Sequence, residues 1–324
     1  MTKISLEDAF NSYFHNKYSF NDFLTLDTSV QYENIFHSKN TFSPNKELKK
    51  YQQFLNVFIF DFMKINKGVV FSYRKGVNNY DAIYPHRNKK YILSTDIKSF
   101  FLNIDKLKVQ ELILSNKENY LIIAEDIERY IEKLINLVIY NGALPIGAPT
   151  SPKISNAYLL SFDNEMQKYC QKYEVIYTRY SDDFIFSANK RESLSNILDE
   201  IRKIFLTMGF DNFELNEEKT KIQIRGSRVS LLGLIITPNG HITVDKKIKK
   251  NIEILFHFYL TDRKKYKDFL DRQYIPKNSN TTAIDKVSGI LNYIYPIDSK
   301  FIHKLKKRYG NYIVNSFMDR SIND

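Results

Sequence analysis

Cysteine is almost absent from this chain, which has one, Cys170, among its 324 residues, and tryptophan is missing altogether. A single cysteine excludes an internal disulfide framework and a zinc site built on several thiolates. No apolar run approaches the ~20 residues of a membrane-spanning helix. The first residues also lack the apolar segment of a secretory signal. We therefore expect a cytoplasmic protein with no membrane partner.

Positive charge and aromatic rings are abundant. Lysine and arginine outnumber aspartate and glutamate by 48 to 37, for a net charge of +11. Such an excess favours a polyanion as partner. A hydrophobic content of 43% allows a large core. At this length, a single enzyme built of several subdomains is the natural interpretation.

Two adjacent carboxylates are the most informative feature of the chain. Residues 180–183 read YSDD and lie between the apolar runs 176–180 and 184–187. This pattern predicts a β-hairpin with the polar step at its turn. Buried carboxylates at such a tip would be costly without a neutralising cation. Two Mg²⁺ ions would serve, because hard cations prefer carboxylate oxygens and a paired site suits phosphoryl transfer.

Two further segments carry related signals. Residues 91–96 are an apolar strand that ends on Asp96, a third carboxylate for the same site. Residues 144–156, LPIGAPTSPKISN, form a Gly/Pro-rich loop that opens a helix, a type of element that lets backbone approach a substrate. We also expect a strand at residues 69–73 and a helix at residues 193–208.

These segments, in this order, resemble the bacterial reverse transcriptases that include retron, group II intron and abortive-infection or defence-associated enzymes. The Asp96 strand is similar to their motif A, residues 144–156 to motif B and residues 180–183 to motif C. Residues 215–221 and 231–235 resemble motifs D and E. The resemblance extends over residues 35–315.

The resemblance implies an α+β right-hand polymerase fold. Residues 1–90 would form the N-terminal region and the fingers. Residues 91–240 would form a palm with an antiparallel sheet and a helical insertion at residues 106–140. The basic, helical residues 241–324 would form the thumb.

It also implies the roles of the acidic residues. Asp96 and Asp182 would be shared ligands of two Mg²⁺ ions, with Asp183 as the third acid and the carbonyl of Ile97 as a further ligand. These ions would lower the pKa of a primer 3′-hydroxyl and stabilise the transferred phosphate. Lys219 would donate a proton to departing pyrophosphate.

Substrate contacts follow from the same resemblance. Phe101 would be the steric gate that selects dNTPs over NTPs, with an ordinary core position as its alternative. The nucleotide pocket would include Gly147, Ser151 and Asn156, with Lys39 or Arg74 on the triphosphate. Nucleic acid would contact Tyr180, Gly233, Lys304, Lys306, Lys307 and Arg308.

Two departures distinguish this chain from retron enzymes. Ile146 stands where motif B usually carries glutamine, and residues 231–233 read LLG in place of VTG. Both departures favour a defence-associated enzyme over a retron.

We therefore expect an RNA-directed DNA polymerase that copies a dedicated noncoding RNA in anti-phage defence. Its partners would be the RNA template, dNTPs and the DNA product. We expect no endonuclease domain after the thumb. A further partner, either an effector protein or a second copy of the chain, is therefore left open. An untemplated or self-primed polymerase is the alternative that Ile146 motivates. A catalytically idle RNA-binding module is a second, disfavoured by the three acids.

Overall fold

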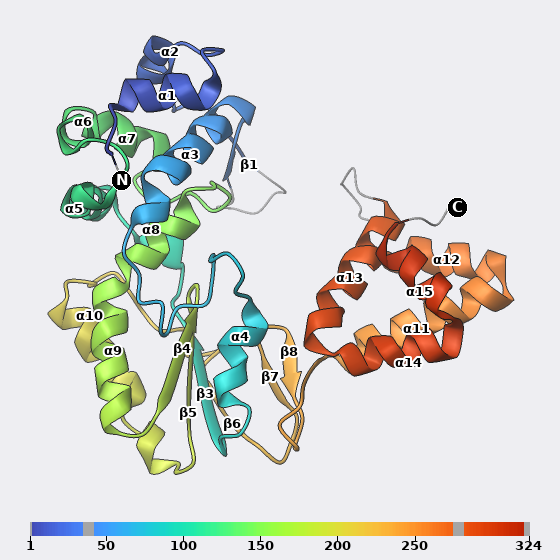
Figure 1. Ribbon diagram of the computed structural model, residues 1–324. Coiled ribbons are helices and arrows are strands. Elements are labelled where there is room, and N and C mark those ends of the chain that lie inside the picture. Colours follow the sequence, from blue (N-terminus) through green and yellow to red (C-terminus); the bar gives the residue numbers. More distant parts are fainter. Residues whose placement is uncertain (1, 35–41, 275–281, 321–324) are drawn as a thin grey trace. The chain divides into compact units, whose positions relative to one another are not determined.

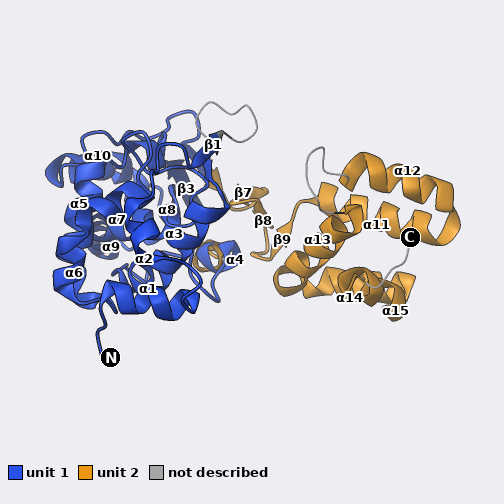
Figure 2. Ribbon diagram, turned by 90° about the horizontal axis from the view of Figure 1, so that it is seen from above, with its two compact units in different colours: residues 1–82, 91–222 blue, residues 83–90, 223–324 orange. Residues whose placement is uncertain are grey.

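The chain divides into two compact units in a computed structural model that describes residues 2–34, 42–274 and 282–320 (Figure 2). Unit 1 comprises Met1–Ala82 and Tyr91–Ile222, and unit 2 comprises Ile83–Lys90 and Gln223–Asp324. None of the helices within the described ranges is long and apolar enough to cross a membrane.

Unit 1 combines a helical region with a four-stranded sheet (Figure 1). Its helices, of which α4 ends across the unit boundary, are α1 (Leu6–Phe14), α2 (Phe20–Thr25), α3 (Lys46–Phe58), α4 (Asn79–Ile83), α5 (Lys106–Ser115), α6 (Ala124–Arg129), α7 (Ile131–Val138), α8 (Ser151–Tyr158), α9 (Leu160–Lys172) and α10 (Ile197–Thr207). Its strands are β1 (Tyr32–Asn34), β2 (Phe42–Pro44), β3 (Tyr91–Asp96), β4 (Ile176–Tyr180), β5 (Asp183–Ala188) and, across the unit boundary, β6 (Lys221–Ile224).

Side-chain caps fix where the first helices begin. Ser5 accepts a hydrogen bond from the Asp8 amide at the start of α1, and Asn45 accepts one from the Leu48 amide at the start of α3. Each cap satisfies an amide that has no partner within its helix. Buried rings such as Phe10 then join α1, α2 and α3, because the Phe10 ring lies 5.0 Å from that of Phe23 and 5.5 Å from that of Phe54.

The sheet has the strand order β4-β5-β3-β6, and its pairings β3–β5 and β4–β5 are antiparallel. The predicted hairpin at residues 176–187 is confirmed as β4 and β5. Helices α9 and α10 pack together beside this sheet. The Phe162 ring of α9 stacks 5.1 Å from Phe184 of β5 and lies 5.1 Å from Phe205 of α10. These aromatic contacts hold α9 and α10 against the sheet.

Residues 69–73, expected to form a strand, do not form one. The segment makes a single bridge, between Val70 and Arg179. Two backbone hydrogen bonds hold it, from the Phe71 amide to the Arg179 carbonyl (2.9 Å) and from the Arg179 amide to the Val69 carbonyl (2.7 Å). Tyr73 then takes a positive φ of 55°, which turns the chain away before a ladder can extend.

Unit 2 contains a three-stranded sheet and a helical region. The sheet has the order β7-β8-β9, formed by β7 (Val229–Leu231), β8 (Leu234–Ile236) and β9 (Ile242–Val244). The helices are α11 (Lys246–Thr261), α12 (Arg263–Tyr274), α13 (Ala283–Ile297), α14 (Ser299–Tyr309) and α15 (Asn311–Met318). Their shared core includes Phe256, whose ring lies 5.5 Å from Tyr309 and 4.9 Å from Phe317.

Candidate active site

Three carboxylates gather where β3 ends and β5 begins. The register of the two strands places Asp96 directly opposite Asp183, and Asp182 lies in the turn that leads into β5. The turn is tied to the end of β3, because the Ile97 amide donates to the Asp182 carbonyl (3.3 Å). Strand pairing thus brings together Asp96 and Asp183, which lie 87 positions apart in the sequence.

Asp96 has one satisfied and one unsatisfied oxygen. Its side chain is buried, and Oδ2 accepts a hydrogen bond from Lys219 Nζ at 2.9 Å. Oδ1 is also buried and has no hydrogen-bond partner. An orphaned buried carboxylate oxygen is costly unless a cation or water satisfies it.

The segment that carries Lys219 is attached to β3 by several contacts. The Asn216 amide donates to the Asp96 carbonyl (2.8 Å), and the Lys98 amide donates to the Glu214 carbonyl (2.9 Å). The hydroxyls of Thr95 and Thr220 lie 2.7 Å apart. These contacts place Lys219 beside the carboxylates although the residue lies in an irregular stretch.

Burial and mutual repulsion shift the pKa values at this site. Burial, together with the negative charges of Asp182 and Asp96, raises the pKa of Asp183 to about 6. Burial also raises the pKa of Asp182, with a smaller contribution from Asp96. The hydrogen bond to Asp96 raises the pKa of Lys219, so its ammonium stays protonated at neutral pH.

The donor chemistry of the site fits a divalent cation. Carboxylate oxygens are the preferred ligands of Mg²⁺, and the orphaned Asp96 oxygen is one of them. Within the described ranges, however, no three His, Cys, Asp or Glu side chains lie close enough together to form a ready-made metal site.

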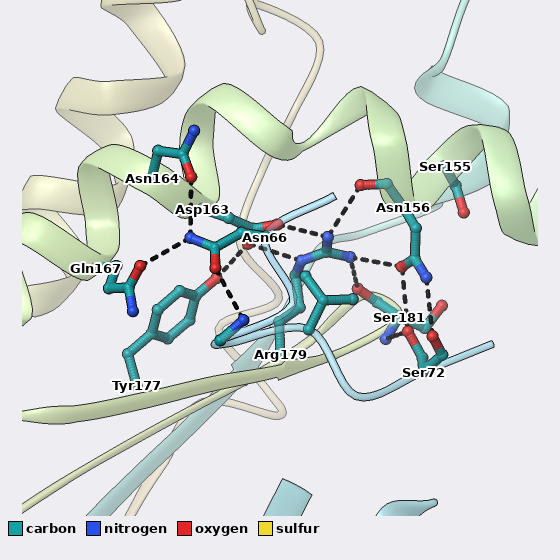
Figure 3. A network of polar contacts seen from close by, with 12 residues as sticks. Asn66, Ser72, Ser155, Asn156, Asp163, Asn164, Gln167, Tyr177, Arg179 and Ser181 are labelled. Atoms are coloured by element: carbon teal, nitrogen blue, oxygen red, sulfur yellow. Dashed lines mark hydrogen bonds and ion pairs between the residues drawn. The ribbon is translucent and has the colours of Figure 1, made fainter. Parts of the chain in front are cut away.

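A buried polar network lies beneath the turn, and sequence reasoning missed it (Figure 3). Arg179 and Asp163 are both fully buried and form an ion pair, in which Nη2 lies 2.6 Å from Oδ2. The other end of the guanidinium reaches Asn156 of α8 and the carbonyl of Ser181. The sequence carried one partial signal, since Arg179 is the one charged residue in the strand segment IYTRY of β4.

The predicted motif B residues are placed mainly by backbone contacts. Ser151 is buried and donates to the Pro145 carbonyl (2.8 Å), which closes the loop before α8. Gly147 has a φ of 111°, and a Cβ there would lie 2.8 Å from the Phe42 carbonyl oxygen. Asn156 belongs to the network under the turn, and its amide donates to the Ser72 carbonyl (2.9 Å).

Phe101 lies in the short 3₁₀ helix Phe100–Asn103, directly after the Asp96 strand. Its ring is partly buried and lies 5.4 Å from that of Phe100, which in turn lies 5.6 Å from Phe213. The ring is therefore supported from the core side without being enclosed.

A basic cavity of about 380 Å³ lies beside the same network. Its lining includes Lys67, Arg74, Lys75 and Lys153, together with Tyr73, Asn156 and Asp61, of which Asp61 pairs with Lys153 (2.6 Å). Arg74 Nη1 donates to the carbonyls of Lys67 (3.0 Å) and Val70, so this side chain also holds its own loop. Lys39, the other predicted triphosphate contact, lies outside the described residues.

The remaining predicted residues are spread over other elements. Tyr180 ends β4 and pairs in register with Asp183. Gly233 lies in the turn between β7 and β8 of unit 2. The basic cluster lies on α14, where Lys304 pairs with Glu253 (3.0 Å) and Lys306 lies 5.8 Å from the Tyr295 ring; the cluster comprises Lys304, Lys306, Lys307 and Arg308.

Comparisons with known proteins place this geometry in context. Residues 39–236 match the family model described as "Reverse transcriptase (RNA-dependent DNA polymerase)". The retron Ec83 reverse transcriptase of Escherichia coli is 26% identical over 254 residues, which cover 76% of this chain and 74% of that protein. The retron Ec73 reverse transcriptase, also from Escherichia coli, is 26% identical over 84% of this chain and 83% of its own length.

Solved structures with some similarity include apo telomerase from Candida tropicalis. It has a TM-score of 0.46 and 14% identity, over 84% of this chain and 52% of that one. Telomerase from Candida albicans has a TM-score of 0.41 and 13% identity, over 81% of this chain and 47% of that one.

Proposed function

We propose that this chain, which belongs to the reverse transcriptase (RNA-dependent DNA polymerase) family, copies one dedicated noncoding RNA into DNA in anti-phage defence. The chain is an RNA-directed DNA polymerase with the α+β right-hand polymerase fold of that family. The identity of the RNA template, the fate of the DNA product and the role in defence are what we propose beyond this activity. We also propose that it acts in the cytoplasm, because its one cysteine, Cys170, is buried and unpaired.

One observation supports the catalytic assignment most strongly. Asp96 and Asp183 face each other on paired strands, Asp182 lies in the turn that leads into β5, and one Asp96 oxygen is buried without a partner. Two Mg²⁺ ions held by these three carboxylates and the Ile97 carbonyl would lower the pKa of the primer 3′-hydroxyl and neutralise charge on the phosphate. Structural burial alone gives no reason to collect three acids at one sheet edge.

The other residues act on substrate. Lys219, protonated beside Asp96, donates its proton to the departing pyrophosphate. The Phe101 ring excludes a 2′-hydroxyl from the sugar position and so selects dNTPs. The nucleotide contacts Gly147, Ser151 and Asn156, and Lys39 or Arg74 holds its triphosphate; the basic cavity beside Arg74 supports the latter choice.

The parts of the polymerase follow the same scheme. We assign residues 1–90 to the N-terminal region and fingers, residues 91–240 to the palm and residues 241–324 to the thumb. Nucleic acid is held by Tyr180, Gly233 and the basic cluster of α14. An effector protein or a second copy of the chain completes the defence system.

Sequencing the nucleic acid that copurifies with the protein tests the proposed template. A single abundant small RNA, joined to or paired with its own cDNA, is the expected result. A heterogeneous mixture that mirrors cellular RNA would count against a dedicated template. Cells carrying the Asp182→Asn variant should also lose any phage resistance that the parent gives.

Ile146 favours a second candidate, an untemplated or self-primed polymerase. Its side chain is 37% exposed in the motif B loop and offers no amide to an incoming base pair. Omitting RNA from the reaction separates the two candidates. DNA products of unrelated sequence without template would favour untemplated synthesis, and a strict RNA requirement would favour copying.

A further inference from the structure

The catalytic turn contains a strained residue. Ser181 has a φ of 60°, a left-handed conformation that a non-glycine residue adopts at a cost in free energy. Such a residue persists only where the surrounding structure over-determines it. Because Ser181 directly precedes Asp182 and Asp183, whatever holds Ser181 also sets the direction in which both carboxylates leave the turn.

Three contacts hold Ser181, and each comes from a different residue; Figure 3 shows those made by Arg179 and Ser72. The Ser181 carbonyl accepts from Arg179 Nη1 at 3.0 Å. The Ser181 amide donates to Ser72 Oγ at 2.8 Å, and the Ser181 hydroxyl lies 3.1 Å from the hydroxyl of Tyr73. Both backbone polar groups and the side chain of the strained residue are thereby satisfied.

Arg179 is itself immobilised. Its guanidinium makes five hydrogen bonds, which use all of its N–H groups: two to the Asp163 carboxylate, two to Asn156 and one to Ser181. Tyr177 donates a further hydrogen bond to Asp163 at 2.8 Å. Figure 3 shows the guanidinium lying between Asp163 on one side and Asn156 on the other. A buried, bidentate fork of this kind is a rigid support.

Stability alone does not explain this arrangement. Well-packed apolar side chains would fill the same volume without the cost of burying two charges. They could not, however, bind the carbonyl of a left-handed turn residue. A role in fixing the Ser181 turn accounts for the buried ion pair between Arg179 and Asp163.

We propose that Arg179, Asp163 and Ser72 are positioning residues that hold the Ser181 turn so that Asp182 and Asp183 meet Asp96. None of the three touches the reacting atoms; each acts through Ser181 or through another member of the network. Ser72 also donates to Asn156 Oδ1 (3.1 Å), so the segment at residues 69–73 is joined to the same support. This inference rests on the polymerase activity of the chain.

Ser72→Ala tests the proposal with the smallest change. It removes the acceptor of the Ser181 amide and leaves the buried ion pair intact. We expect kcat for primer extension on an RNA template to fall by up to about a hundredfold, as a catalytic group displaced by about 1 Å would cause. The Mg²⁺ concentration for half-maximal activity should rise, while KM for dNTP changes little. RNA affinity should stay near that of the parent, and the melting temperature should fall only by what the loss of this buried hydrogen bond causes.

Ser155→Ala is the matched control. Ser155 is also a fully buried serine, but its hydroxyl bonds only to the Pro152 carbonyl within its own helix (3.1 Å). Its kcat and Mg²⁺ dependence should equal those of the parent. Equal losses in both serine variants, or no loss with Ser72→Ala, would overturn the positioning role.

Tyr73→Phe provides a second, independent variant in case Ser72→Ala does not fold. Its ring is 40% exposed, so only the hydroxyl contact with Ser181 is lost. A smaller drop in kcat with the same rise in Mg²⁺ requirement supports the proposal, and an unchanged Mg²⁺ profile contradicts it. A parent protein that extends no primer would instead contradict the polymerase assignment, and the positioning role with it.

Discussion

Asp183 carries the clearest electrostatic signature at the scale of single residues. Burial and the acidic neighbours of Asp183 raise its pKa to about 6. Between pH 3.8 and about 6 the folded protein therefore holds a proton that the unfolded chain releases. Between pH 3.8 and about 6 the free energy of unfolding should therefore fall as pH rises. The carboxylate cluster is thus a local cost in stability that function retains.

Replacing Asp183 by Asn should raise the melting temperature at neutral pH in the absence of divalent cations, because it removes one repelling charge. Added Mg²⁺ should then stabilise the parent more than the variant. Thermal denaturation in EDTA and in Mg²⁺ measures both effects. Asp199→Asn, at an exposed position of α10, is the control and should show neither. A variant less stable than the parent in EDTA would refute the repulsion.

Phe101 offers a second test at this scale. Phe101→Ala should raise the ratio of NTP to dNTP incorporation, because the bulk beneath the 2′ position is lost. The ring is only partly buried, so the variant should still fold. Single-nucleotide extension with each substrate gives the ratio. If it were unchanged in a folded variant, Phe101 would be an ordinary core residue.

The motif B loop illustrates how contacts between elements constrain sequence. Gly147 approaches the Phe42 backbone so closely that an added Cβ would lie 2.8 Å from a carbonyl oxygen, whereas nothing lies within 4 Å of a Cβ at Gly142. Both glycines have positive φ, so Ala costs about 1–2 kcal/mol of backbone strain at either.

Gly147→Ala should therefore destabilise the protein by about 1–3 kcal/mol more than Gly142→Ala, through overpacking against β2. Chemical denaturation of the two variants measures the difference. Equal free energies of unfolding would show that the Phe42 contact has no energetic weight. A reduced activity in Gly147→Ala alone would link the contact to the nucleotide pocket.

Strand periodicity made the hairpin β4–β5 and the Asp96 strand predictable, since β-branched and aromatic residues flank both. The prediction of a strand at residues 69–73 was wrong. The composition is typical of a strand, but Tyr73 turns the chain at a positive φ. The Arg179–Asp163 pair could not be predicted either. Pairing between residues that lie 16 positions apart depends on how α9 packs on the sheet, which no local pattern encodes.

At the scale of the whole molecule, the net charge of +11 implies a polyanion partner, and the basic cluster of α14 is one place where it can act. Replacing Lys304, Lys306, Lys307 and Arg308 by Gln should weaken RNA binding. It should also flatten the salt dependence: the slope of log affinity against log salt concentration should become shallower by roughly 0.7 to 0.9 for each lost phosphate contact. Lys304 should contribute least, because Glu253 already pairs with it.

A charge-matched variant controls for net charge. Lys168, Lys172, Lys190 and Lys203 are exposed positions of unit 1, and replacing them by Gln removes the same charge. Titrations of labelled RNA at several salt concentrations compare the two variants. Identical affinities and slopes would show that the α14 cluster has no specific role in RNA binding.

Asp96, Asp182 and Asp183 should together supply the catalytic carboxylates of this RNA-directed DNA polymerase. Extension of a DNA primer on an RNA template with dNTPs and Mg²⁺ tests this role most directly, with the parent, Asp182→Asn and the control Asp199→Asn side by side. The parent and control should extend the primer equally, and Asp182→Asn should lose on the order of 10⁴-fold in rate, as when a catalytic group is removed elsewhere. Extension by Asp182→Asn at the parental rate would show that this carboxylate is not a catalytic metal ligand.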